Sequence, residues 1–222
     1  MGNSFDKITK SKLYELGSIL WDIVALSLLW LIFSIPVITS AASSSALYFA
    51  LYRRIKKESD NAVPDFMRSF AGNLKQSIPL SLLYVLFAAV IAFNINIARY
   101  GIGGIALPEW YLPLALLLIV PYLVIYPFAY PYLARFCTNT ATIIKNAAAF
   151  SAMNPGKAIL LFILSFASIA LMILFPPCLL VMPFTAAYLR VLIVEKIFEA
   201  AIEREHKAGE EEDTEDMGET DA

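Results

Sequence analysis

Residues 23–52, with the sequence IVALSLLWLIFSIPVITSAASSSALYFALY, contain no charged side chain. One helix needs about 20 apolar residues to cross a lipid bilayer, so this stretch of 30 residues is too long for a single upright helix. Pro36 interrupts it near the middle, and proline breaks helices because it lacks a backbone donor and clashes with the preceding turn. We therefore interpret the stretch as a membrane hairpin, with Ser18–Ile35 running out and Thr39–Tyr52 running back.

Three further stretches also lack charge: 76–98, 110–134 and 158–189, with 23, 25 and 32 residues. The first two each predict one crossing. The third contains three prolines and predicts a second hairpin, Ala158–Phe175 followed by Pro177–Ile193. The chain is 59% hydrophobic and 16% charged, against about 45–50% and about 25% in soluble domains. A large buried core of a soluble protein is the disfavoured alternative, since four such stretches rarely coincide there.

The positive charges distinguish between the possible arrangements. With six crossings, 16 of the 17 Lys and Arg residues lie on one side and only Arg99 lies on the other. The positive-inside rule places the basic side, and with it both termini, in the cytoplasm. If both long stretches crossed only once, the split would be 13 to 4. We predict an all-α, polytopic membrane helix bundle of about six short crossings arranged as helical hairpins, located in the cell membrane.

One segment leaves the number of crossings open. Thr39–Tyr52 is about 21 Å long at 1.5 Å per residue, whereas the hydrocarbon core is about 30 Å thick. Snorkelling arginines and local thinning of the bilayer extend the reach of such a helix. Five spans plus a re-entrant segment satisfy the charges equally well.

The N-terminus has a second interpretation as a secretory signal peptide. Three lysines in the first 12 residues would form its basic region, and Thr39–Ala42 would form a small-residue cleavage site. However, Trp21, Asp22 and Trp30 lie within the apolar stretch, which is also long for a signal peptide. A retained first crossing is therefore favoured.

The last 15 residues contain eight acidic residues and no basic one. Without them the chain has 17 basic and 11 acidic residues, and a basic domain suits the anionic cytoplasmic leaflet. We predict a membrane domain over residues 1–207, which ends in a helix extending into the cytoplasm, and a disordered acidic tail over 208–222. A binding role for the tail is the alternative.

Small residues predict where the helices pack most closely. Helices in lipid associate through close packing of small side chains, and Ala42, Ala46 and Ala50 repeat at four-residue spacing, with Ser43 beside them. The segment is expected to be an inner helix; a polar pore wall made by its serines is the alternative. Asp65–Phe70 and Ile143–Ala152 are interpreted as amphipathic helices on the cytoplasmic surface. The two cysteines, Cys137 and Cys178, are not expected to pair.

The sequence contains no pattern typical of catalysis. His206 is the only histidine, and there is no metal-ligand spacing, phosphate-binding glycine loop or nucleophile elbow. We predict no catalytic, cofactor-binding or metal-binding residues and no nucleic-acid partner; the chain is predicted not to be an enzyme.

Polar residues inside predicted crossings are functional candidates by default. Asp22, Asn94, Asn96 and Tyr126 are the candidates for a polar path or a coupling site, and Glu195 lies near the inner face. Two bland interpretations compete with this one. Asp22 lies only one turn past the predicted interface and would face water, and the Tyr126 hydroxyl would be satisfied by carbonyls that neighbouring prolines free.

Two blocks carry a family resemblance: Pro36–Phe49 followed by Arg53-Arg54, and then Asp65–Gln76, DFMRSFAGNLKQ. In order and spacing they resemble the YesL-like family of bacterial integral membrane proteins, a domain of unknown function. Ala41 departs from the pattern, since the family usually has glycine there. The family has no established catalytic residues. Its members are often encoded near carbohydrate-uptake and sugar-sensing systems, which implies a cellular context.

Two functions are consistent with these features. The first is a non-enzymatic accessory or regulatory subunit linked to carbohydrate uptake or sensing, with the lipid bilayer and a sugar transporter or sensor kinase component as partners. The basic cytoplasmic loops would dock such a partner. The second is a small-solute channel or transporter in its own right, which needs a polar path through the bundle.

Overall fold

The computed structural model describes residues 2–101, 108–117, 119–136 and 138–219, and these residues form helices and turns without a strand. The elements follow one another as α1 (Gly2–Ser34), η1 (Val37–Thr39), α2 (Ser40–Ile55), α3 (Ala62–Tyr100), α4 (Tyr111–Leu117), α5 (Ile119–Arg135), α6 (Thr140–Met153), α7 (Pro155–Leu174), η2 (Pro176–Leu180) and α8 (Met182–Glu219). The all-α prediction is confirmed. Within the described residues, three helical segments are long and apolar enough to cross a membrane: Gly17–Ser34, Ala62–Tyr100 and Pro155–Leu174.

The helix α2 lies at the centre of the molecule and contacts α1, α3, α5 and α8. It begins after the Pro36 turn, where the Thr39 hydroxyl donates to the carbonyls of Phe33 at 2.6 Å and Pro36 at 2.8 Å. The first bond satisfies a carbonyl that the ending helix α1 leaves free, and the second closes the turn that follows α1. On α3, the Ser81 hydroxyl accepts a hydrogen bond from the Ala41 amide at 3.1 Å. The start of α2 is therefore held by both neighbouring helices.

The helix α3 differs from the prediction. A separate surface helix was expected at Asp65–Phe70, but α3 runs without interruption from Ala62 to Tyr100 and includes Pro79. Nothing between the predicted surface helix and the apolar stretch forces the backbone out of the helical conformation. The junction between α6 and α7 shows the contrast: Asn154, with φ −133° and ψ 59°, precedes Pro155 at the first position of α7. A residue before proline disfavours the helical conformation, so this helix ends there.

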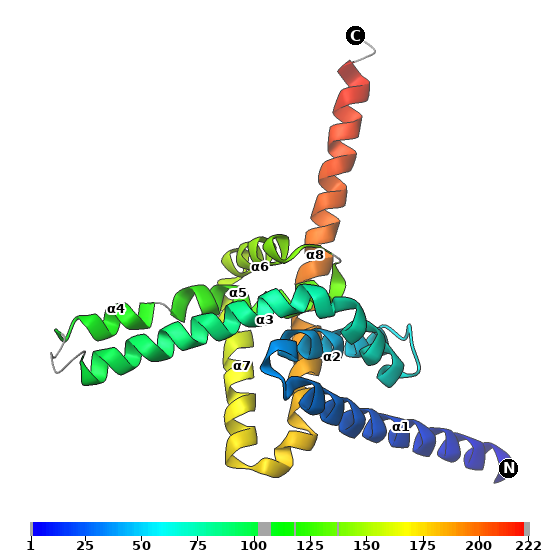
Figure 1. Cartoon of the computed structure of the whole chain (residues 1–222). Helices are drawn as coiled ribbons and strands as arrows, with labels where there is room; N and C mark the ends of the chain where they lie inside the picture. The colour runs from blue at the N-terminus through cyan, green and yellow to red at the C-terminus, as the bar shows by residue number, and fades with distance from the viewer. Residues whose placement is uncertain (1, 102–107, 118, 137, 220–222) are drawn as a thin grey trace.

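The long helices do not all run parallel. In Figure 1, α3 and α4 extend together to one side, crosswise to the paired α7 and α8, while α1 leaves on the other side. The chain turns between α7 and α8 through η2, as the proline-rich segment predicts. Six spans of one bilayer would have to run roughly parallel to one another. Since these helices do not, the number of crossings stays a prediction.

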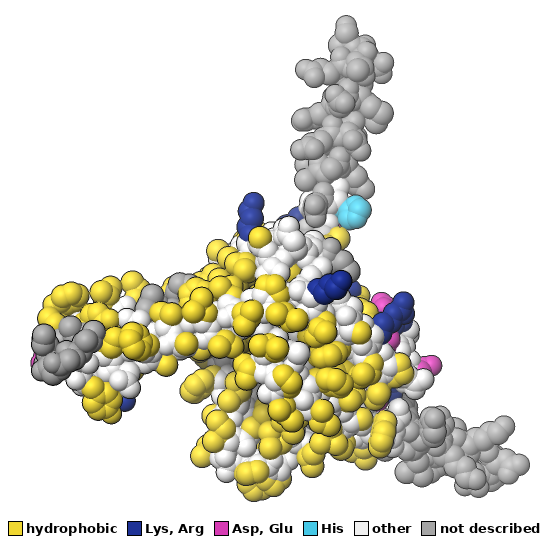
Figure 2. All heavy atoms as spheres, viewed as in Figure 1, with side chains coloured by type: hydrophobic (Ala, Val, Ile, Leu, Met, Phe, Trp, Pro, Cys, Tyr) yellow, Lys and Arg dark blue, Asp and Glu magenta, His cyan; other side chains and the backbone are white. Residues whose placement is uncertain are grey.

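Apolar and basic side chains occupy different parts of the surface. Figure 2 shows hydrophobic side chains covering the α3–α4 arm and the lower part of the molecule, whereas Lys and Arg gather mainly around α6, α8 and the α2–α3 connection. Large apolar side chains on α7 are strongly exposed, with Ile173 at 75% and Leu174 at 80%. Burying such surface away from water is favourable by about 25 cal/mol per Å², so a lipid environment suits this part of the chain.

The C-terminal segment of the chain belongs to the helix α8, which extends into the region of the acidic tail. The helix α8 continues to Glu219 and projects away from the other helices (Figure 1), where the sequence predicts a disordered tail from 208. Ala, Glu and Lys are strong helix formers, which favours continuation of α8 into this segment. Disorder over 208–222 stays a prediction.

Cys178 is a free thiol, and Cys137 lies outside the described residues.

Candidate functional site

One face of α2, continued by Lys56 directly after the helix, carries a row of polar side chains at four-residue spacing: Ser44, Tyr48, Tyr52 and Lys56. Residues four apart lie on the same side of a helix. Each of the four contacts a different helix or residue, as described below, so the row connects the middle of the molecule to the end of α2. We call this row the polar face of α2.

Near the end of α2, the polar face meets a carboxylate that is only 6% exposed, Glu195 on α8. The Tyr48 hydroxyl donates to Glu195 Oε1 at 2.7 Å, and Arg135 Nε of α5 lies 3.5 Å from the same oxygen. The Arg135 guanidinium also lies over the Tyr52 ring, 3.9 Å from its centroid, a favourable cation–π geometry. Glu195 follows the predicted crossing 177–193, and burial raises the pKa of its carboxyl.

The adjacent arginines at the end of α2 each have an acidic partner on a different helix. Arg53 Nη1 donates to Asp65 Oδ1 of α3 at 2.6 Å. Arg54 Nε lies 3.2 Å from Asp22 Oδ2 of α1, and its Nη1 donates to the Asp60 carbonyl at 2.8 Å. Both carboxylates are 6% exposed. These pairs tie α1, α2 and α3 together at one point.

A tight turn brings the following loop back to these arginines. Lys57 has a φ of 57°, a left-handed conformation that commonly ends helices. The Glu58 amide then donates to the Arg53 carbonyl at 2.9 Å. Beside this turn, Lys56 forms an ion pair with Glu199 of α8. We call the set Arg53, Arg54, Lys56 and Arg135, with their acidic partners, the charged end of α2.

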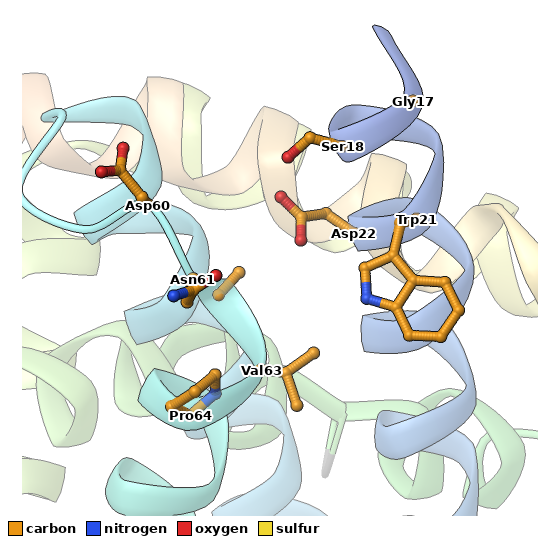
Figure 3. A pocket seen from close by; sticks show the side chains of 9 residues that line it. Gly17, Ser18, Trp21, Asp22, Asp60, Asn61, Val63 and Pro64 are labelled. Carbon is orange, nitrogen blue, oxygen red and sulfur yellow. The ribbon is translucent and has the colours of Figure 1, made fainter. Parts of the chain in front are cut away.

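An open pocket of about 530 Å³ lies between α1 and the start of α3. Figure 3 shows Asp22 and Ser18 on the α1 side, with Asp60, Asn61 and Val63 opposite. The Asp22 carboxylate is thus both the partner of Arg54 and a wall of the pocket. The pocket is therefore lined by hydrogen-bond acceptors and by apolar side chains, and it lies beside the Asp22–Arg54 ion pair.

A second, smaller pocket of about 70 Å³ lies between α1, α2, α5, α7 and α8. Its polar lining includes Trp30, Ser44, Tyr126, Ser165 and Arg190, and none of its lining residues is acidic. The lining is completed by Leu47, Ser168, Ile169, Met172, Pro183, Ala186 and Ala187. We call it the Arg190 pocket.

The arginine of this pocket sits beside the middle of α7. Arg190 Nη2 donates to the Ser165 hydroxyl, and Ser165 lies halfway along α7. The guanidinium carbon is 5.8 Å from the centroid of the Tyr126 ring. Arg190 Nε is buried and has no hydrogen-bond partner among the described residues. The sequence places Arg190 at the cytoplasmic side, whereas its guanidinium lies alongside the centre of a predicted crossing.

The four candidates for a polar path lie in three different places. Asp22 pairs with Arg54 at the charged end of α2, and Tyr126 lines the Arg190 pocket. Asn94 lies near the far end of α3, where its amide donates to the Val90 carbonyl at 2.8 Å. Its carbonyl oxygen accepts from the Tyr111 hydroxyl at 2.7 Å. Asn96 is exposed on the same part of α3. The structure does not bring the four together.

The predicted packing residues are all buried: Ala42, Ala46, Ala50 and Ser43 are 0% exposed. The Ser43 hydroxyl donates to the Trp30 carbonyl at 3.0 Å. Two neighbouring serines accept hydrogen bonds from other helices, Ser44 from Trp30 Nε1 and Ser45 from Asn73, both at 3.1 Å. These hydroxyls therefore join helices to one another.

The roles of Arg135 and Arg190 do not follow from the sequence. There, both residues count only as cytoplasmic positive charges. One sequence feature points to Arg190 and Glu195: they are the charged residues within a mainly apolar segment that follows Pro183. Which helix each side chain would face depends on packing between distant parts of the chain. Within the described ranges, no three His, Cys, Asp or Glu side chains are grouped so that they could hold a metal ion.

Comparison with known proteins gives one match. Residues 23–95 match a family described as "Protein of unknown function, DUF624". The matching segment is about a third of the chain and includes α2, both arginines at its end and Asp65. It does not reach the helices that carry Arg135, Arg190 and Glu195. No curated protein and no solved structure matches the chain.

Proposed function

We propose that this chain is a non-enzymatic, multi-pass protein of the bacterial plasma membrane that acts as an accessory or regulatory subunit in carbohydrate uptake or sensing. The proposal includes about six crossings with both termini in the cytoplasm. Similarity to an uncharacterised family over residues 23–95, and the resemblance of the same region to YesL-like proteins, support the context.

The closely packed centre of the molecule is the main support for this proposal. A channel needs an open polar path, but α2 is surrounded by neighbouring helices and its small residues are fully buried. Ser43, Ser44 and Ser45 hydrogen-bond to groups of other helices, so the serines that would line a pore hold the bundle together instead. A packed centre favours a protein that works through a partner.

The open pocket beside Asp22 is where we expect a partner to bind. It lies next to the charged end of α2, which belongs to the side predicted to face the cytoplasm. Ion pairs with three helices hold the adjacent arginines and the following loop in place. A surface fixed in this way loses little conformational freedom on docking, which favours binding.

Site-specific crosslinking in growing cells tests this proposal. A photoreactive amino acid replaces Asn61, at the exposed rim of the open pocket, and in a matched control it replaces Ile173, which is exposed at the far end of α7. We expect a covalent product with a sugar-transporter subunit or a sensor kinase only from position 61. Growth of a deletion strain across carbon sources identifies the sugar. Absence of such a product at position 61, together with unchanged growth on every sugar, would contradict the proposal.

A small-solute channel or transporter is the second candidate, because Tyr126 lies in a pocket that also holds an arginine. It predicts solute flux into vesicles reconstituted with the purified protein. Flux equal to that of protein-free vesicles for all tested sugars and ions removes this candidate.

A further inference from the structure

Arg190 differs from the other described cations in having neither an acidic partner nor full exposure to the surroundings. Arg53, Arg54 and Arg135 are partly buried and each lies within 4 Å of a carboxylate. The unpaired lysines and arginines of the described side chains are exposed: Lys57, Arg68, Lys75, Arg99, Lys145, Lys157, Lys196 and Arg204. Arg190 is half-buried and takes part in no ion pair among the described residues.

An unpaired charge among packed helices is costly, because the surroundings cannot replace its hydration. Removing one partner of a buried ion pair is strongly destabilising for the same reason. Ser165 and the Tyr126 ring contribute dipoles near Arg190, but neither supplies a negative charge. The guanidinium therefore needs a counter-charge that the described part of the chain does not provide.

The groups that line the Arg190 pocket are suited to bind such a counter-charge. Arg190 Nε is a buried donor without an acceptor. The Ser44 hydroxyl accepts from Trp30 Nε1, which leaves its own proton available to donate. The Tyr126 hydroxyl is another donor in the lining, whereas none of the described residues that line the space carries a carboxylate. Several donors with no acidic acceptor are the complement of a negatively charged ligand.

The size of the pocket limits the ligand. A cavity needs about 10–15 Å³ to hold one water, so a pocket of about 70 Å³ holds a few groups of that size. A sugar does not fit such a space, and neither does gluconate. A halide fits, with room for a water that completes its shell.

We propose that the Arg190 pocket binds a small dissolved anion of halide size, which neutralises Arg190 and links α8 to α1, α2, α5 and α7. This inference goes beyond the proposed partner function and does not depend on it. Water alone would satisfy the donors but would leave the charge without a counter-charge.

The position of Trp30 provides a direct readout, because its indole lines the pocket. A protein with Trp21→Phe and Trp110→Phe retains Trp30 as its only tryptophan. It is placed in nanodiscs of phosphatidylcholine and titrated with sodium bromide against sodium gluconate at constant ionic strength. Bromide quenches indole fluorescence on contact. We expect saturable quenching of Trp30 that chloride, a poor quencher, reverses by competition.

The variant R190Q is expected to weaken the saturable quenching by about tenfold or more, since a charge-assisted hydrogen bond is worth about 1.5–3 kcal/mol and 1.4 kcal/mol is a factor of ten. The control R204Q removes an exposed arginine from the same helix and is expected to leave the titration unchanged. Quenching that is linear in bromide and equal in R190Q overturns the proposal. If R190Q does not fold, a linear titration of the parent protein without chloride competition overturns it as well.

A lipid phosphate is the other source of negative charge near these helices. A parallel titration uses nanodiscs that contain phosphatidylglycerol. Saturable quenching that survives in the anionic lipid supports a dissolved anion. Saturable quenching that disappears there shows that lipid occupies the pocket, and the proposal of a dissolved anion is then wrong.

Discussion

The charged end of α2 and the Arg190 pocket both place arginines among packed helices, but only the first supplies the opposing charges. At the charged end, acids from α1, α3 and α8 lie against Arg54, Arg53 and Arg135. In the pocket, Arg190 has a serine hydroxyl and an aromatic ring for neighbours. The difference indicates that the charged end is a structural clamp, complete within the chain, whereas the pocket is completed by something that the chain binds.

The largest effect is expected from Glu195→Ala, which removes a carboxylate from the clamp. The change leaves the Tyr48 hydroxyl without its acceptor and Arg135 without its counter-charge, both of them in packed surroundings. We expect a loss of about 3 kcal/mol in the free energy of unfolding, measured by SDS titration followed by circular dichroism. Glu195→Gln keeps an acceptor for Tyr48 but also leaves Arg135 without a counter-charge, so it should lose about 1 kcal/mol less than Glu195→Ala. Equal losses for the two variants would show that the hydroxyl contact matters little.

The next effect compares the two regions directly through Arg54→Met and Arg190→Met, measured without halide. Arg54→Met leaves the buried Asp22 unpaired, so the free energy of unfolding should fall by about 1–2 kcal/mol. Arg190→Met removes a charge that has no acidic partner and should leave stability unchanged or raise it by about 1 kcal/mol. Adding bromide should stabilise the unaltered protein and not Arg190→Met. A comparable loss in both variants would break the distinction between clamp and pocket.

The smallest effect is expected at the exposed pair Lys56–Glu199. The hydrogen bond to Glu199 raises the pKa of the Lys56 ammonium, so the folded protein holds this proton more tightly than the unfolded chain does. Any stabilisation is therefore present below the ordinary lysine pKa of 10.5 and is lost as pH rises through the folded value. Salt screens exposed pairs, so Lys56→Gln should shift the unfolding midpoint less than any variant above. A shift as large as that of Arg54→Met would show that this exposed pair stabilises the fold as strongly as the buried pairs of the clamp do.

Helix boundaries could be predicted from local chemistry. Pro36 and the prolines after Phe175 mark the turns of both hairpins, and the helix predicted at Thr39–Tyr52 is observed as α2 over Ser40–Ile55. Charge and proline act on the few residues around them, so their effect can be seen without knowing the fold. The continuity of α3 through Pro79 could not be predicted in this way.

The site residues were predicted unevenly for a related reason. Asp22 and Tyr126 could be singled out as polar residues in apolar stretches, but their partners could not. The pairing of Asp22 with Arg54 and the approach of Arg190 to Ser165 depend on which faces of α1, α2, α7 and α8 meet. Such meetings depend on side-chain packing over the whole bundle, and local patterns do not encode them.

We propose that the charged end of α2 lies in the cytoplasm and that the Arg190 pocket lies within the membrane. Single cysteines at Ser59 and at Ser168, in a protein with Cys137 and Cys178 replaced by serine, test both parts with one impermeant thiol reagent. We predict that S59C reacts only in inside-out vesicles and that S168C reacts from neither side. Reaction of S59C from outside intact cells would contradict the account.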